Sequence, residues 1–132
     1  MRASAAWVGL AVLYLATFAA PAGLAESDIE RGQRLFERCA SCHTLAEGGR
    51  RMPGPSLKGV IGRRAGTLSG FDFSDAMIEA GRDRGLVWNE ATLFDYLDDT
   101  DAYVPGTAMG FLKVADPEDR KALIAYLKVK GG

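Results

Sequence analysis

Cys39-Ala40-Ser41-Cys42-His43 decides how this chain folds, because these five residues hold both cysteines and the one histidine of the sequence. A structural zinc site needs about four ligands, and the chain has no other Cys or His. A thioredoxin-like dithiol would follow a strand in a parallel-sheet fold and would leave His43 without a role. Attachment of a haem uses all three residues, since each thiol adds to a vinyl group and the imidazole is carried under the iron. The motif therefore predicts one haem c, bound covalently through Cys39 and Cys42.

The start of the chain has the pattern of an export signal. Residues 1–25 carry a single charged side chain, near the beginning, and a central apolar run that has the length of a signal-peptide core and is short for a membrane span. Gly23-Leu24-Ala25 places small residues at the minus-three and minus-one positions of a cut before Glu26. We predict a signal peptide over 1–25, a folded domain over 26–132 and export to the periplasm of a Gram-negative bacterium. An uncleaved anchor stays open, because the uncharged stretch before Glu26 is long enough for a tilted helix.

Composition indicates one small globular domain. The sequence has 132 residues, of which 48% are hydrophobic and 25% charged, and this length leaves no room for a second, substrate-processing domain. Without residues 1–25 the chain carries 15 Lys and Arg against 17 Asp and Glu, a net charge of −2, so we expect no nucleic-acid partner. A domain of this size buries a modest fraction of its apolar surface, and a covalently held cofactor would add stability.

The spacing of apolar residues predicts an all-α fold with long loops. The expected helices cover 27–39, 74–80, 89–97 and 117–129. Ser27 and Glu30 form a capping-box pattern at the first of them, and Gly81 is expected to stop the second. The stretches 46–70 and 98–114 are rich in Gly and Pro and are expected to be loops. A loop as long as 46–70 in a compact domain needs something to wrap around.

A haem iron with His43 on one side needs a second ligand to become six-coordinate, and Met, Lys and Tyr are the candidates. Methionine is the soft, neutral ligand that raises the potential of a carrier haem. Met77 falls within a predicted helix and is typical of core filler, while Met52 follows His43 too closely to reach the opposite haem face. Met109 lies far along the chain on a loop with Pro105-Gly106. We therefore expect His43 and Met109 to be the metal ligands.

Further residues recur in an order and spacing that is far more specific than the cysteine motif alone. They are Gly32, Phe36, Gly54-Pro55-Ser56-Leu57, Gly62-Arg63, Gly70-Phe71, Trp88, the run from Thr92 to Leu97, the run from Pro105 to Met109, and the run from Leu123 to Leu127. Together with the motif, they resemble class I cytochromes c, the family of mitochondrial cytochrome c and its bacterial relatives. The resemblance covers essentially the whole chain after residue 25, and it implies the small helical fold of that family, wrapped around one haem.

The resemblance also implies roles for single residues. Pro55 resembles the proline whose carbonyl accepts a hydrogen bond from the ligand histidine, which sets its tautomer and raises its basicity. Arg63 and Trp88 resemble donors to a haem propionate, and Thr107 resembles a further propionate donor. Tyr96 resembles the tyrosine that donates to the ligand sulfur. With the cysteines and the two ligands, these residues form the expected cofactor-binding set.

The chain departs from the family where partners would dock. Phe73 stands where a propionate-binding tyrosine is usual, Ala108 replaces a lysine beside Met109, and a few residues are inserted between Phe73 and Trp88. The positive ring of mitochondrial cytochrome c is thus thinned. The remaining candidates for a basic patch around the haem edge are Arg50, Arg51, Lys58 and Lys113.

These observations predict a monomeric, soluble one-electron carrier and not an enzyme. A six-coordinate iron has no open position for a substrate, and the electron would pass through an exposed haem edge to protein redox partners in a transient interface. A respiratory or photosynthetic type of chain would supply those partners. Two alternatives stay open: a carrier tethered to the membrane by residues 1–25, and a haem-based peroxidase or gas sensor from which Met109 dissociates.

Overall fold

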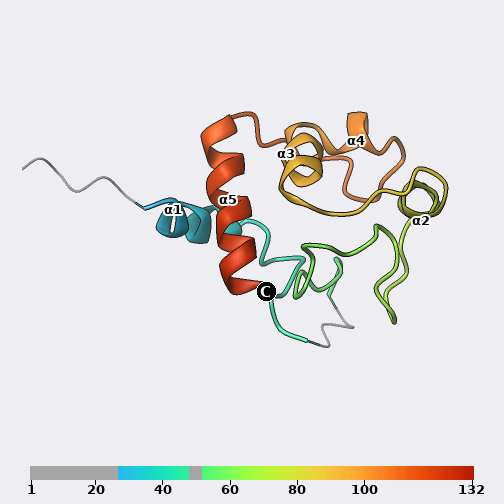
Figure 1. The fold of residues 1–132 in the computed structure, drawn as a ribbon, viewed down its shortest axis with the longest axis horizontal. Coiled ribbons are helices and arrows are strands. Elements are labelled where there is room, and N and C mark those ends of the chain that lie inside the picture. The colour runs from blue at the N-terminus through green and yellow to red at the C-terminus, as the bar shows by residue number, and fades with distance from the viewer. Residues whose placement is uncertain (1–26, 48–51) are drawn as a thin grey trace, which may run out of the picture.

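The computed structural model describes residues 27–47 and 52–132 and contains five α-helices in those ranges (Figure 1). They are α1 (Asp28–Phe36), α2 (Asp75–Arg82), α3 (Glu90–Asp98), α4 (Thr100–Tyr103) and α5 (Pro117–Lys130). An isolated bridge between Arg64 and Val87 is the one strand-like pairing in this part of the chain, which confirms the all-α prediction. None of the described helices is long and apolar enough to cross a membrane. The predicted signal peptide and its cleavage site lie outside the described residues.

The helices begin where their capping residues predict. At α1 the Ser27 hydroxyl accepts a hydrogen bond from the Glu30 amide at 3.3 Å, and the Glu30 carboxylate accepts from the Ser27 amide at 3.1 Å, which satisfies two amides that a helix start leaves without partners. The Asn89 side chain caps α3 in the same way. Asp116 caps α5, with Pro at the first helical position. Local sequence therefore determines these starts.

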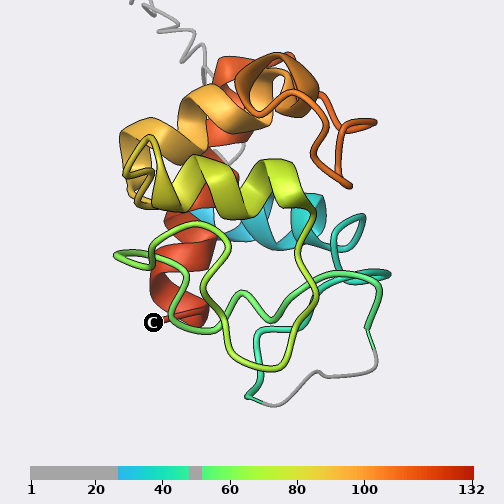
Figure 2. The same ribbon diagram turned by 90° about the vertical axis from the view of Figure 1, so that its right-hand side faces the viewer.

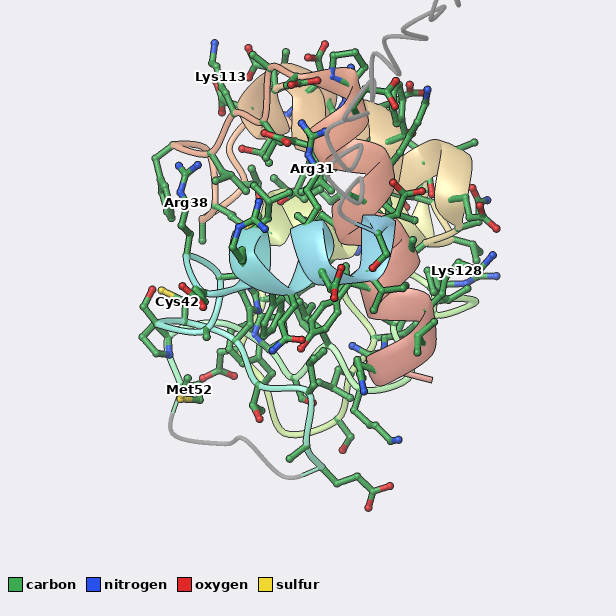
Figure 3. All side chains as sticks on the ribbon, turned by 90° about the vertical axis from the view of Figure 1, so that its left-hand side faces the viewer. Arg31, Arg38, Cys42, Met52, Lys113 and Lys128 are labelled. Carbon is green, nitrogen blue, oxygen red and sulfur yellow. The ribbon has the colours of Figure 1, made fainter. Side chains whose placement is uncertain are left out.

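Helices α1 and α5 cross, and they make the most extensive contact between any two described helices (Figures 1 and 2). Gly32 lies at the contact point, where a β-carbon would overlap the carbonyl oxygen of Ala122 and lie 2.6 Å from the Tyr126 β-carbon. The Phe36 and Tyr126 rings pack beside it with centroids 5.6 Å apart. Arg31, seen between the two helices in Figure 3, donates to Asp119 at 2.7 Å. A residue without a side chain is what lets the helices approach so closely.

The prediction that Gly81 stops the second helix is wrong. Helix α2 continues through Gly81 to Arg82, and a β-carbon on Gly81 would overlap the carbonyl oxygen of Ala65. Gly81 therefore serves the close approach of α2 to the 52–73 loop. The chain reverses at Gly85, whose φ of 66° lies in the left-handed region that favours glycine.

The expectation of an uninterrupted loop over 98–114 is also wrong, because the short helix α4 lies inside it. The Asp99 carboxylate accepts a hydrogen bond from the Ala102 amide at 3.1 Å and caps this helix. Thr100, the first residue of α4, has no exposed surface. An Asp-Thr pair after α3 is a capping signal, but a single turn carries too few residues to show helical periodicity.

Arg120 joins the end of this loop to the helices. Its Nη1 donates to the Asp98 carboxylate at 2.7 Å and to the Val114 carbonyl at 2.6 Å, and its guanidinium lies 4.3 Å from the centroid of the Phe94 ring. The residue is buried on α5. The guanidinium thus holds the last residues of the loop against both α3 and α5.

Replacing Gly32 with alanine tests whether the helix crossing limits stability. Alanine gains about 1 kcal/mol of helix propensity over glycine, but the overlap with Ala122 forces the helices apart, so we expect a net loss of roughly 2 kcal/mol in the free energy of unfolding. Denaturant unfolding of the haem-loaded protein measures it. Gln33→Ala, at the exposed neighbouring position of α1, is the control. A Gly32→Ala variant as stable as this control would contradict the close approach.

Candidate cofactor site

A cavity of about 300 Å³ opens between the turns after α1, the loop before α2, helices α3 and α5, and the loop after α4. Most of its walls are apolar side chains, among them Phe36, Leu57, Val60, Leu93, Leu123 and Leu127. All nine residues that the sequence nominates for cofactor binding line this cavity: Cys39, Cys42, His43, Pro55, Arg63, Trp88, Tyr96, Thr107 and Met109. Segments separated by up to 70 residues therefore converge on one space.

The cysteine motif lies in the turns that continue α1 and not in the helix itself. The Cys39 amide donates to the Phe36 carbonyl at 2.8 Å, and the His43 amide donates to the Cys39 carbonyl at 2.8 Å. The two cysteines form no disulfide with each other. Burial raises the pKa of the Cys39 thiol, with nearby Arg38 opposing the effect, whereas a redox-active dithiol needs a lowered pKa. The surroundings of Cys39 thus disfavour the thioredoxin-like alternative.

His43 is fixed by a backbone acceptor. Its Nδ1 lies 2.7 Å from the Pro55 carbonyl oxygen, and because a carbonyl can only accept, Nδ1 carries the proton and Nε2 keeps its lone pair. Burial lowers the pKa of His43, although the bond to Pro55 opposes the effect, so the neutral form that binds metals is favoured. A β-carbon on Gly54 would lie 2.5 Å from His43 Cε1. The Gly54 backbone therefore forms a close cradle for the ring.

Arg63 and Trp88 offer donors that find no acidic partner among the described residues. Arg63 donates to the backbone carbonyl of Ser56 at 2.8 Å and to that of Lys58, and burial lowers the pKa of its guanidinium. The Trp88 side chain is buried against Tyr96, with ring centroids 4.9 Å apart, and its indole N–H donates to no described residue. A half-buried cation and a buried N–H on one cavity wall suit a carboxylate on a bound molecule.

Met109 follows a tight turn. Pro105 and Gly106 occupy its centre, Gly106 has a φ of 85°, and the Thr107 amide donates to the Val104 carbonyl at 3.0 Å, as a type II turn requires. The Thr107 hydroxyl accepts from the Met109 amide at 3.4 Å. The turn therefore sets the backbone direction just before the methionine.

Tyr96 lies under this turn. Its hydroxyl is 3.3 Å from Thr107 Oγ1, and in the described part of the chain it makes no hydrogen bond to the Met109 sulfur. Burial raises the pKa of Tyr96, with the Thr107 contact opposing it, so the phenol keeps its proton. The structure thus brings Tyr96, Thr107 and Met109 to one corner of the cavity.

The other methionines are placed differently. Met52 lies below Cys42 in the view of Figure 3 and does not line the cavity. Met77, on α2, does line it, but the residue is buried within the apolar core. The sequence nominated neither Met77 nor Gly54 as part of the site. Gly54 could have been predicted as part of the site, because it directly precedes Pro55 in the segment that resembles the family. Met77 could not, because its helical spacing indicated only core packing.

Two residues of the expected basic patch, Lys58 and Lys113, have partners within the chain. The Lys58 Nζ donates to the terminal oxygen of Gly132 at 2.6 Å, and the Lys113 Nζ pairs with the Asp99 carboxylate at 2.6 Å. Arg50 and Arg51 lie outside the described residues. The exposed residues that line the cavity are instead Pro53, Asp72, Ala108 and Phe111, of which Phe111 is 77% exposed.

The residues present fit a covalently held haem. The cavity provides two thiols, a neutral imidazole with a free Nε2, apolar walls, and the Arg63 guanidinium and Trp88 indole N–H as donors for carboxylates. A small helical fold with such a site defines a c-type haem protein.

Comparison with known proteins supports the assignment to the c-type haem proteins. A model of the family described as Cytochrome c matches residues 29–129. Cytochrome c of Chlamydomonas reinhardtii is 44% identical over 116 residues, covering 86% of this chain and 96% of that protein, and cytochrome c of Gibberella zeae is 42% identical over 106 residues, covering 80% and 96%. Among solved structures, cytochrome cH from Methylobacterium extorquens (TM-score 0.69, 40% identity) covers 79% of this chain and all of its own, and cytochrome c2 from Rhodospirillum centenum (TM-score 0.72, 31% identity) covers 80% and all of its own.

The chain belongs to the cytochrome c family and has the fold of its class I members. It therefore carries one haem c, attached covalently through Cys39 and Cys42, and it is an electron-transfer haem protein. The family resemblance, the all-α fold and the cofactor predicted from the sequence are confirmed.

Removing the attachment site should abolish the fold. In a Cys39→Ala, Cys42→Ala variant nothing retains the haem, and the open cavity leaves the apolar walls without packing partners. We expect the far-ultraviolet circular dichroism of the purified variant to lose most of its helical signal. Ser41→Ala, between the two cysteines and exposed, is the control and should keep that signal. A haem-free double variant with full helix content would show that the fold does not need the cofactor.

Proposed function

We propose that this chain is a soluble one-electron carrier whose haem iron is held between His43 and Met109. The observation that supports it most is that both side chains line one cavity: the Pro55 carbonyl holds the His43 ring, and the Thr100 hydroxyl holds the Met109 backbone through its carbonyl. When bound, the haem supplies a metal centre that accepts and releases a single electron. The protein residues determine the relative stability of the oxidised and reduced haem and which redox partners can approach it.

Each wall of the cavity has its own task in this proposal. Pro55 holds the proton on His43 Nδ1, so that Nε2 remains the ligating atom. Arg63, Trp88 and Thr107 bind the carboxylates of the cofactor and compensate their charge. Tyr96 can turn its hydroxyl proton from Thr107 toward the Met109 sulfur. The apolar side chains exclude water, which disfavours the extra positive charge of the oxidised state and raises the potential.

Protein redox partners would meet the chain at the cavity mouth. Phe111, Ala108 and Asp72 are exposed there, and an aromatic side chain at the centre of a small interface supplies contact area at little entropic cost. The Lys113 ammonium pairs with the Asp99 carboxylate, which partly compensates its charge, and the Lys58 ammonium donates to a backbone oxygen of Gly132. With a net charge of −2 for residues 26–132, we infer weak electrostatic steering toward acidic partners and monomeric behaviour.

The structure favours a carrier over an enzyme or gas sensor with a labile methionine. A sensor needs a sixth position that opens readily. Here the residues around Met109 are bonded to one another and to α4, an arrangement that resists opening. We therefore infer that the chain has no catalytic residues.

Replacing Met109 with alanine tests the ligand assignment. The haem should stay attached, but the ferric protein should bind added imidazole readily and its reduction potential should fall, because the thioether is lost. Absorption spectroscopy and potentiometry measure these changes. Met77→Ala is the matched control on the same cavity and should reduce stability by roughly 2–5 kcal/mol with the iron ligation unchanged. If Met77→Ala and not Met109→Ala opened the iron, the assignment would be reversed.

The proposal includes export, with the mature protein in the periplasm of a Gram-negative bacterium. Residues 1–25 should be removed, so that the purified holoprotein begins at or near Glu26, since Gly23-Leu24-Ala25 is the well-placed small-x-small site. Intact-mass spectrometry of the haem-loaded protein from the native host measures this. A mass that retains Met1 or Arg2 would favour the membrane-tethered carrier instead.

A further inference from the structure

Thr100 is a polar residue with no exposed surface, and its hydroxyl lies against the backbone of the Met109 loop. Thr100 Oγ1 is 2.6 Å from the Met109 carbonyl oxygen and 3.0 Å from the Leu112 carbonyl oxygen. A hydroxyl has one proton to donate, and the shorter distance makes Met109 the main acceptor. The Thr100 amide, 3.3 Å from the Leu112 carbonyl, serves the other. Thr100 thus donates to both carbonyls, and the Leu112 amide adds a second donor to the Met109 carbonyl at 3.2 Å.

The rest of α4 is fastened to the same loop, so Thr100 is a firm point of attachment. The Asp101 carboxylate accepts from the Gly106 amide at 3.1 Å, ahead of Met109 in the sequence. The Val104 amide donates to the Thr100 carbonyl at 3.0 Å. The Lys113 ion pair with Asp99 closes the loop on the far side. Helix α4 therefore holds the loop before, at and after the methionine.

From this placement we infer that Thr100 is a positioning residue for Met109: its hydroxyl holds the Met109 carbonyl and so keeps the thioether on the iron. The inference rests on the proposed ligation by Met109. Freeing the sixth position requires the loop to move, and that movement breaks the part-buried hydrogen bond from Thr100. The Met109 carbonyl would keep the Leu112 amide, at 3.2 Å, as a donor, but it would lose the shorter of its two hydrogen bonds, so the hydroxyl shifts the equilibrium toward the closed loop.

The competing explanation is that the Thr100 side chain only fills space in the core. The Thr100→Val variant distinguishes this packing role from the hydrogen-bonding role. Thr100→Val keeps the branched shape and removes the donor, whereas Thr100→Ser keeps the donor and removes a methyl group. Thr100→Ala provides a second donor-free variant should valine pack poorly. Thr67→Val is the matched control, because the Thr67 hydroxyl also donates to a backbone carbonyl, that of Arg64 at 2.7 Å, but at an exposed site away from the Met109 loop.

The experiment titrates the ferric holoprotein with imidazole, an external ligand that binds only where the native sixth ligand has left, and follows the absorption spectrum. We expect Thr100→Val and Thr100→Ala to bind imidazole roughly tenfold more tightly than the parent, and Thr100→Ser and Thr67→Val to stay within about twofold of it. Denaturant midpoints are measured in parallel, so that loss of global stability is recognised as such.

The outcomes distinguish this inference from the proposal beneath it. If Met109→Ala binds imidazole no better than the parent, the proposed ligation fails, and the role of Thr100 fails with it. If Met109→Ala binds imidazole much more tightly but Thr100→Val and Thr100→Ala match the parent, only the positioning role is overturned. The same holds if imidazole affinity in these variants follows the denaturant midpoint and Thr100→Ser shows an equal change.

Discussion

The need to fill an apolar cavity governs this molecule. A chain of about a hundred folded residues leaves roughly 300 Å³ between its helices and loops, and its walls are the residues that another fold would pack against each other. The haem, attached at Cys39 and Cys42, serves as the missing part of the core. This explains how the five described helices, among which α1 and α5 cross closely at Gly32, can support two long loops.

The two sides of the cavity are held by different means. On one side, Cys39, Cys42 and His43 come from a single turn, and Pro55 follows only twelve residues after His43, so local geometry suffices. On the other side, Met109 reaches the cavity from a loop between α3 and α5, and its placement depends on the Pro105-Gly106 turn and the contacts to α4. The attachment side is covalent and short in sequence, while the ligand side depends on a network of non-covalent bonds. We therefore expect substitutions on the Met109 side, more than on the attachment side, to change the properties of the haem iron.

The sequence allowed prediction of the parts that depend on local chemistry. The capping residues Ser27 and Asn89, and Pro117 at the start of α5, each act within a few residues, and the structure shows them as predicted. The first helix ends at Phe36 and not at Cys39 as expected, so the cysteine motif lies in the turns that follow it. The distant residues that the resemblance assigned to the cofactor line one cavity, and their individual roles stay predictions. Gly81 was misjudged because a glycine can serve close packing as well as a helix end, and the difference depends on Ala65, sixteen residues away. Helix α4 was missed because a single turn has no periodicity, and the contact of Thr100 with Met109 is purely tertiary.

The central claim is that the iron lies between His43 and Met109, and proton NMR of the reduced holoprotein with isotope-labelled methionine methyl groups tests it most directly. A methyl group held against the face of a porphyrin is strongly shielded by the ring current, whereas methyl groups elsewhere in the protein are not. We predict one strongly shielded methionine methyl signal, absent from Met109→Ala and retained in Met52→Ala and Met77→Ala. A spectrum without such a signal, or one in which it disappears with Met52 or Met77, would contradict the account.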